Sequence, residues 1–203
     1  MRSNETWQQQ AYLKAGNTRR SNGFGNAVSF SFDGDTLAVG SSFFDNNRDD
    51  SLFESQGAVF TFTRTNALWQ QQAFLQASNA DPRGLFGASI SLSADGNTLA
   101  VGAPDEGSFA TGINGSQETV LGFIPGAVYM FTRDNAVWQQ QAYVKASNTD
   151  GGDRFGSAVN LSLDGNTLAV GAIGEESTAT GINGDQSDNS SISLRTPGAV
   201  YLY

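Results

Sequence analysis

An eleven-residue segment that occurs three times constrains the fold of this chain more than any other feature. It reads WQQQAYLKAGN from Trp7, WQQQAFLQASN from Trp69 and WQQQAYVKASN from Trp138. A Phe-Gly pair follows each tryptophan at the same distance, and an Asp-Gly pair follows each Phe-Gly pair at the same distance. Because self-similarity at a fixed period marks repeat architectures, the sequence predicts three units, over residues 1–62, 63–131 and 132–203.

Each unit contains four short segments with the pattern of β-strands. In the first segment, alternate residues from Trp7 share one face, and both faces carry polar residues, which is typical of an exposed outer strand. The segment after Phe-Gly alternates apolar and polar residues, and an Asp-Gly turn then leads into the apolar run LAVG, a strong hairpin signal. The fourth segment is GAVFTF, GAVYMF or GAVYLY. No segment has the 3.6-residue apolar period of a helix, so we expect an all-β fold.

Four-stranded sheets repeated in series at this spacing favour the blades of a β-propeller. An open β-solenoid and a single β-sandwich are the alternatives, but known solenoid repeats are shorter and sandwiches do not copy their own sequence. The positions that define the repeat are three tryptophans, three phenylalanines and three aspartates: Trp7, Trp69, Trp138, Phe24, Phe86, Phe155, Asp33, Asp95 and Asp164.

Composition excludes several classes of function. The chain of 203 residues has neither cysteine nor histidine, which removes disulfides, thiolate chemistry, imidazole bases and the usual zinc ligands. Its formal net charge of −9 argues against nucleic-acid binding, which requires lysine and arginine. No apolar stretch approaches the roughly 20 residues that a membrane helix needs, so we expect no membrane insertion, and no signal peptide is evident in this chain.

The ordered motifs FG, DG, LAVGAP and GAVYMF in the second unit resemble the FG-GAP repeat of integrin alpha-subunit propellers. The Trp-Gln-Gln segment and the loop ATGING make the chain similar to bacterial proteins that carry such repeats in series. Phe86-Gly87 and Gly102-Ala103-Pro104 match the family motif literally, whereas the first unit has VGSS and the third VGAI. The resemblance implies a β-propeller that binds or adheres to other molecules at the cell surface or outside the cell.

Many members of that family hold calcium in a DxDxDG loop between the first two strands of the repeat. Here the connections are SFDGDT, SADGNT and SLDGNT, which keep the last aspartate and lack the acids upstream. Calcium takes six to eight oxygen ligands, so we expect Asp-Gly turns without metal and no cofactor. The loop GDQSDNSS, with Asp185 and Asp188, is a second, weaker calcium candidate.

The resemblance also implies that each Trp-Gln-Gln strand is the outer strand of the preceding blade. The strand from Trp69 then completes the sheet begun at Phe24, and the strand from Trp138 completes the sheet begun at Phe86. The sheet begun at Phe155 has one candidate within the chain, the strand from Trp7. Because propellers typically have 4–8 blades, three blades predict either a part of a longer propeller or a dimer of six blades, closed by strand exchange.

The connections that vary in length predict the binding surface. They alternate with the short turns, so they and the loops between Trp and Phe-Gly should emerge on one face, where recognition usually resides. The candidate ligand-binding residues on this face are charged: Arg19, Arg20, Arg83, Asp105, Glu106, Arg154, Glu175, Glu176 and Asp185.

Three functions fit these observations. The first is a non-catalytic binding or adhesion module for a protein or glycan ligand. The second is a structural subunit that assembles by strand exchange into an oligomer or filament. The third is a carbohydrate-active enzyme, because adjacent acids such as Asp105-Glu106 could supply the two carboxylates of a glycosidase. Since no serine has a histidine to activate it, we expect a chain without catalytic residues.

Overall fold

The computed structural model describes residues 2–3, 6–17, 22–45, 55–79, 81–120, 122–187 and 196–203. Thirteen strands lie in these ranges: β1 (Arg2–Ser3), β2 (Thr6–Trp7), β3 (Phe24–Phe30), β4 (Thr36–Ser41), β5 (Ala58–Thr65), β6 (Leu68–Leu75), β7 (Ser89–Leu92), β8 (Thr98–Ala103), β9 (Ala127–Asp134), β10 (Val137–Val144), β11 (Phe155–Leu161), β12 (Leu168–Ala172) and β13 (Ala199–Leu202). No helix among the described residues is long and apolar enough to cross a membrane.

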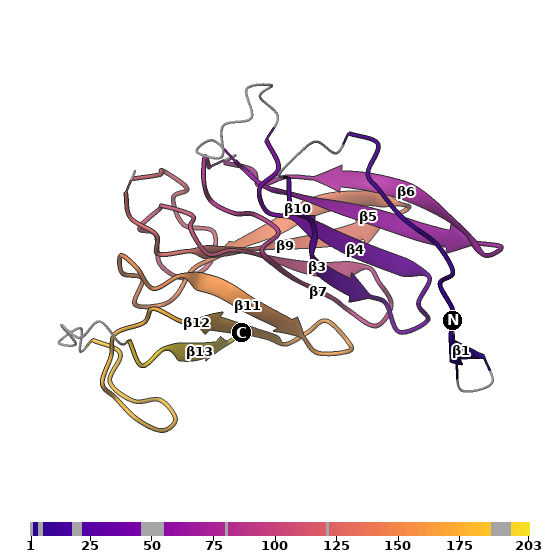
Figure 1. Cartoon of the computed structure of the whole chain (residues 1–203). Coiled ribbons are helices and arrows are strands. Elements are labelled where there is room, and N and C mark those ends of the chain that lie inside the picture. The colour runs from indigo at the N-terminus through magenta and orange to yellow at the C-terminus, as the bar shows by residue number, and fades with distance from the viewer. Residues whose placement is uncertain are drawn as a thin grey trace.

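Strands β3 to β13 form three antiparallel sheets that follow one another along the chain as blades of a β-propeller (Figure 1), and β1 and β2 form a separate two-stranded sheet. The first blade has the order β3-β4-β5-β6, and the second has the order β7-β8-β9-β10. In both, the outer strand comes from the next repeat, so the placement predicted for the strands from Trp69 and Trp138 is confirmed. The third blade contains β11, β12 and β13 and has no fourth strand among the described residues.

The apolar core lies between neighbouring blades. One cluster joins Ala38 and Val59 of the first blade to Ile90, Leu92 and Tyr129 of the second. A second cluster joins Val128 of the second blade to the third blade in the same way. A third cluster lies on the face of the first blade that meets no other blade, where Ala15 and Leu13 of the N-terminal segment pack with Val39, Phe60 and Phe62.

The repeat motifs are the points at which one blade contacts the next. Gly57 forms a β-bridge with Phe86 of the following blade, and Gly126 forms the same bridge with Phe155. Both phenylalanines are buried and pack edge-on against tyrosines of their own blades. The motifs Phe-Gly and Gly-Ala-Val therefore recur because the backbones of successive blades approach each other closely there.

The three Asp-Gly connections are tight turns, as the sequence predicts. Asp33 accepts hydrogen bonds from the Ser31 hydroxyl at 2.6 Å and from the backbone N–H of Asp35 at 2.9 Å. Ser31, in turn, accepts a bond from the backbone N–H of Thr36. Asp95 and Asp164 repeat this arrangement. The hydroxyl bond is the main reason that the pKa of each of these aspartates is lowered.

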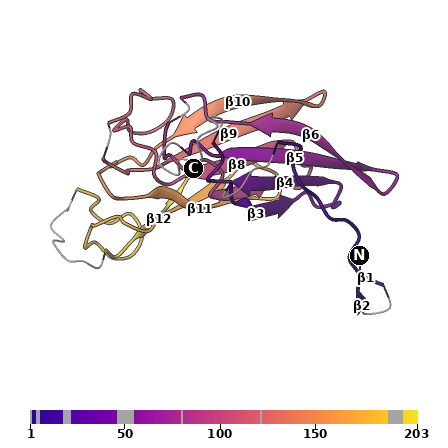
Figure 2. The same ribbon diagram turned by 45° about the horizontal axis from the view of Figure 1, so that its top comes forward.

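The segment from Trp7 does not form the strand that its pattern predicts. Residues 8–15 have no regular secondary structure, and β2 pairs with β1 in a short hairpin. In both views this hairpin lies at one end of the molecule, away from β13 (Figures 1 and 2). In this structure the segment therefore does not complete the third blade, and it lacks the hydrogen-bonded neighbour that a strand requires.

Candidate functional site

The described parts of the long connections, which join the second strand of each blade to the third, lie at one end of the sheets, which we call the loop face; the Asp-Gly turns lie at the other end, the turn face. The backbone N–H of Arg83 donates to the carbonyl of Ser55, which joins loops of the first and second blades. The Asp81 carboxylate accepts a bond from the N–H of Gly107 at 2.8 Å. The long connections and the loops between Trp and Phe-Gly therefore contact each other on the loop face.

An ion pair links the loop faces of the second and third blades. The Arg154 guanidinium donates to one carboxylate oxygen of Asp105 from Nη2 at 2.8 Å and from Nε at 3.2 Å. Both side chains are partly exposed. Arg83 is exposed and, like Arg154, has a positive φ. These three predicted residues lie where a ligand of the loop face could contact them.

Glu106 lies beneath the loop face, because its side chain is fully buried. Its carboxylate accepts bonds from Lys145 Nζ at 2.9 Å, from Asn79 Nδ2 at 3.1 Å and from the Ser108 hydroxyl at 3.2 Å. Lys145 is also fully buried, and burial lowers its pKa while Glu106 acts in the opposite direction. The prediction that Glu106 faces a ligand therefore differs from the structure, in which it pairs with a buried lysine.

Tyr143 and Tyr129 complete this polar cluster, which the sequence did not predict. The Tyr143 hydroxyl makes a short hydrogen bond with the Ser108 hydroxyl, and Tyr129 donates to Asn79 Oδ1 at 2.7 Å. Burial is the main reason that the pKa of each tyrosine is raised. We call Glu106, Ser108, Tyr143 and Lys145 the buried polar cluster; its members come from one long loop, from the outer strand β10 and from the residue that follows β10.

Glu175 occupies the same place in the third blade and is also buried. It accepts a bond from Asn148 Nδ2 at 3.2 Å, and Tyr201 donates to Asn148 Oδ1 at 2.7 Å. These contacts reproduce those of Glu106, Asn79 and Tyr129. Among the ion pairs of the described residues, Glu175 has no cation in the place that Lys145 takes beside Glu106.

The remaining charged residues predicted for the loop face differ in exposure, and some lie outside the described residues. Glu176 is partly exposed. Asp185 is exposed, and its carboxylate accepts bonds from the backbone and hydroxyl of Ser187, so it caps a turn. Arg19, Arg20 and Asp188 lie outside the described residues. Groups of three or more acidic side chains that could hold a metal ion do not occur in the described part of the chain.

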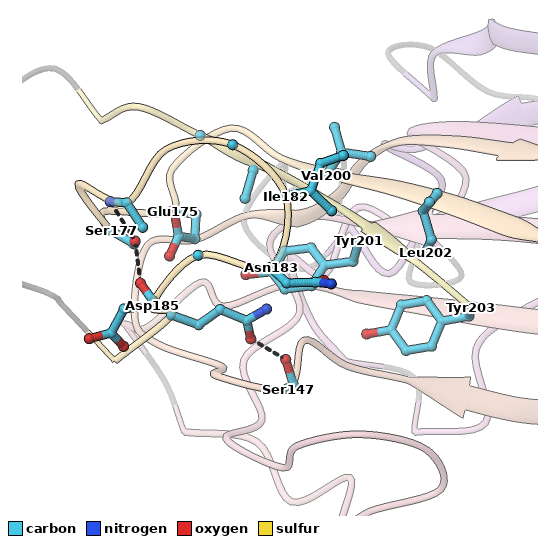
Figure 3. A pocket seen from close by; sticks show the side chains of 16 residues that line it. Ser147, Glu175, Ser177, Ile182, Asn183, Asp185, Val200, Tyr201, Leu202 and Tyr203 are labelled. Atoms are coloured by element: carbon cyan, nitrogen blue, oxygen red, sulfur yellow. Dashed lines mark hydrogen bonds between the residues drawn. The ribbon is translucent and has the colours of Figure 1, made fainter.

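A groove of about 790 Å³ runs beside β13, along the edge where the third blade has no outer strand in the described part of the chain (Figure 3). Its walls are Val200, Tyr201, Leu202 and Tyr203 on one side and the loop 179–184 on the other. Ser147 and Gln186 are joined by a hydrogen bond of 2.7 Å at its edge, and Glu175 also contributes to its lining. The groove combines a strand edge that has no partner among the described strands with a buried acid, which suits a polypeptide ligand.

Asp81 carries a perturbed carboxylate at the base of the loop face. It is buried, and its Oδ1 atom has no hydrogen-bond partner. Burial raises the pKa of Asp81 to about 6, the bond from Gly107 lowers it, and the nearby Glu106 raises it. The native state therefore binds this proton more tightly than the unfolded chain does, and the stability that Asp81 contributes falls as the pH rises from about 4 to about 6.

We expect Asp81→Asn to be more stable than the original chain at pH 7.5, by at most about 3 kcal/mol, because a pKa unit corresponds to 1.36 kcal/mol. At pH 4.5 the difference should be much smaller. Urea unfolding at the two pH values measures both. The pKa values of Asp33, Asp95 and Asp164 are lowered, so these carboxyl groups stay ionised at both pH values and do not affect the comparison. A difference that does not change between the two pH values would contradict the prediction.

Comparisons with known proteins identify the repeat. A family model described as the FG-GAP repeat matches residues 7–62 and 138–203. Among solved structures, the chain is similar to the periplasmic gluconolactonase PpgL of Pseudomonas aeruginosa, with 17% sequence identity and a TM-score of 0.40. This similarity covers 79% of the chain, which spans 39% of the length of the gluconolactonase. A search of curated proteins gave no match.

Proposed function

Because the chain belongs to the FG-GAP repeat family, we propose that it is a non-catalytic binding or adhesion module whose loop face recognises a protein or glycan. The observation that carries this proposal is the gathering of the long connections of all three blades at one end of a rigid β frame. Loops held by a rigid scaffold are where recognition usually resides. The family resemblance extends the proposal to a location at the cell surface or outside the cell.

The loop face has the properties of a preorganised surface. Its loops are joined by backbone hydrogen bonds, by the bond from Gly107 to Asp81 and by the ion pair of Arg154 with Asp105. Fixing loops before binding reduces the conformational entropy that association would otherwise cost. Arg83 and Arg154 offer guanidinium groups, which are frequent anchors of protein interfaces and suit carboxylates.

Catalysis has less support. A glycosidase needs two carboxyl groups that converge on an accessible substrate bond. In the two adjacent acid pairs of the long loops, Glu106 and Glu175 are buried, while Asp105 is held by Arg154. The chain also lacks histidine and cysteine. We therefore propose that the residues of the loop face bind and do not react.

The test is binding of the purified chain to an array of glycans and extracellular proteins, followed by titration of each ligand found. Arg83→Glu and Arg154→Ala change the loop face, and Asp134→Lys is a control of an exposed residue next to the turn face. We expect at least one loop-face variant to lose about tenfold or more in affinity, and the control to bind as the original chain does.

Two results would contradict the proposal. One is hydrolysis of a glycan by the original chain, which would indicate an enzyme. The other is loss of binding in the Asp134→Lys variant while both loop-face variants bind normally. Melting curves of each variant separate a binding defect from a folding defect.

A second candidate function is assembly by strand exchange. It is favoured by the third blade, in which β13 is hydrogen-bonded to β12 alone among the described strands. Assembly and recognition are compatible, because Arg83, Asp105 and Arg154 of the loop face do not line the groove beside β13.

A further inference from the structure

The second blade shows how an outer strand is held. The loop 110–115, with the sequence ATGING, lies along β10 on the side away from β9, and Ile113 forms a β-bridge with Val144. The Asn114 N–H donates to the Tyr143 carbonyl at 2.7 Å, and the Lys145 N–H donates to the Gly112 carbonyl at 2.8 Å. The outer strand therefore lies between β9 and this loop, and we call the loop a clamp.

The third blade contains the same clamp sequence without an outer strand. Residues 179–184 again read ATGING, and they form a wall of the groove beside β13. Ile182, which corresponds to Ile113, is 93% exposed, and it lines the same groove as Val200 (Figure 3). An identical sequence that holds a strand in one blade is thus present without that strand in the next.

The side chains beneath the clamp select the strand. In the second blade, Glu106 and Ser108 of the loop contact Lys145 and Tyr143 of the strand. In the first blade, Phe44 takes the place of Glu106, and it packs against Phe74 of its own outer strand with ring centroids 5.1 Å apart. A loop with a glutamate at this position therefore occurs with an outer strand that carries tyrosine and lysine. A loop with a phenylalanine there occurs with an outer strand that carries phenylalanine and glutamine.

The strand that matches the third blade is the segment from Trp7. The third blade has Glu175 and Ser177 in the places of Glu106 and Ser108. The segment from Trp7 has Tyr12 and Lys14 in the places of Tyr143 and Lys145, whereas the segment from Trp69 has Phe74 and Gln76. Tyr12 is 77% exposed, and Lys14 is exposed and in no ion pair among the described residues.

The segment from Trp7 already lies where the outer strand of a preceding blade would lie. Gln72 of β6 accepts a hydrogen bond from Arg133 of the second blade at 3.0 Å, and Gln10 accepts the same bond from Arg64 of the first blade at 3.1 Å. The N–H of Gly16 donates to Gln71, as the N–H of Ser78 donates to Gln140. Residues 7–16 are therefore positioned to belong to a blade that would stand before the first.

The two end faces of the three blades resemble the two sides of an interface between blades. Val28 and Phe30 of the first blade are exposed, whereas Ile90 and Leu92, which correspond to them, are buried against the first blade. At the other end, Val200 is 71% exposed, whereas the corresponding Val128 is buried. The exposed inner-strand side chains of the first blade and the exposed Val200 of the third blade are thus complementary parts of such an interface, and residues 13–15 cover the rest of the first blade's end face.

We propose that two copies of this chain form a closed ring of six blades, in which residues 7–15 of each copy are the outer strand of the other copy's third blade. Lys14 pairs with Glu175, Tyr12 contacts Ser177, and the clamp 179–184 holds the backbone of the exchanged strand. The same chain cannot supply this strand to itself, because three blades are too few to close a ring. This inference does not depend on the ligand of the loop face.

Cysteine cross-linking tests the pairing, because the chain has no cysteine of its own. Leu13 and Ile182 correspond to Val144 and Ile113, which face each other in the clamp. The variant Leu13→Cys/Ile182→Cys should form a disulfide between chains on oxidation and run at twice the mass on a non-reducing gel. Ile113→Cys/Val144→Cys should cross-link within one chain, and Leu13→Cys/Ile113→Cys should not cross-link specifically.

Charge exchange tests the specificity. Lys14→Glu and Glu175→Lys each place like charges in both interfaces of the dimer, so each should weaken dimerisation at least about a hundredfold. An equal mixture of the two variants restores an opposite pair at both interfaces and should recover the dimer in light scattering. Glu118→Lys, the same charge change on an exposed loop of the second blade, should leave the dimer intact.

Three outcomes would overturn the proposal. The original chain could be a monomer in light scattering at all concentrations, which would indicate that further repeats of a longer protein cover the third blade. The Leu13/Ile182 disulfide could form within one chain. The mixture of charge variants could remain monomeric although both variants have the circular dichroism spectrum of the original chain.

Discussion

Replacing Lys145 with glutamine is expected to lower the free energy of unfolding by about 3–5 kcal/mol, because it leaves the fully buried Glu106 carboxylate without its cation. Asn79 and Ser108 would still donate to Glu106, but neutral donors do not replace a charge in a site from which water is excluded. Urea unfolding followed by tryptophan fluorescence measures the loss. A cost below about 1 kcal/mol would show that the ion pair contributes little to the second blade.

The first blade supplies the matched control for this prediction. It uses Phe44, Phe74 and Gln76 where the second uses Glu106, Tyr143 and Lys145. The triple variant Glu106→Phe/Tyr143→Phe/Lys145→Gln should therefore be more stable than Lys145→Gln alone, because a buried ion pair can be replaced by apolar groups of similar volume without loss. If the triple variant is no more stable than the single one, the two clusters are not interchangeable.

The parts of the fold that local patterns determine could be predicted from the sequence. The Asp-Gly pairs predict the turns that Asp33, Asp95 and Asp164 stabilise. The alternation of apolar residues predicts the inner strands, whose side chains in the second and third blades pack against the preceding blade. The repeated tryptophan segment, together with the family resemblance, predicts that the outer strands β6 and β10 come from the repeat that follows each blade. Each of these features depends on residues that are close in the sequence or copied from repeat to repeat.

The candidate site was less predictable, because it depends on contacts between distant residues. The pair Asp105-Glu106 has the pattern of a solvated loop. In the structure, however, Glu106 is buried and forms an ion pair with Lys145, which lies 39 residues later in the sequence. The strand from Trp7 was predicted from its own alternation, but a strand also needs a neighbour with free hydrogen-bonding groups. A signal was present in both cases: Glu and Ser accompany ATGING in the second and third repeats, and Tyr and Lys occur in two of the three tryptophan segments.

Replacing Gly102 with alanine is the second substitution with a large expected effect. A Cβ atom at this position would lie 2.1 Å from the carbonyl oxygen of Gly156 in the third blade and 2.2 Å from the Ser89 hydroxyl. The backbone of the third blade cannot move away without separating the cluster formed around Phe155 and Val170. We expect a loss of stability at or above the upper end of the ~1–3 kcal/mol typical of overpacking, measured by urea unfolding.

Gly171 is the matched control, because it has the same place in the third blade and no blade beyond it. A Cβ atom there would meet nothing closer than 3.5 Å, so Gly171→Ala should unfold with nearly the stability of the original chain at concentrations where the chain is monomeric. In the proposed dimer, however, the first blade of the second copy would bring the carbonyl of its Gly25 to this position, as Gly156 approaches Gly102. Gly171→Ala should then weaken dimerisation in light scattering without unfolding the chain. If Gly171→Ala destabilises the monomer as much as Gly102→Ala does, the crowding at Gly102 arises within its own blade and not from the neighbouring one.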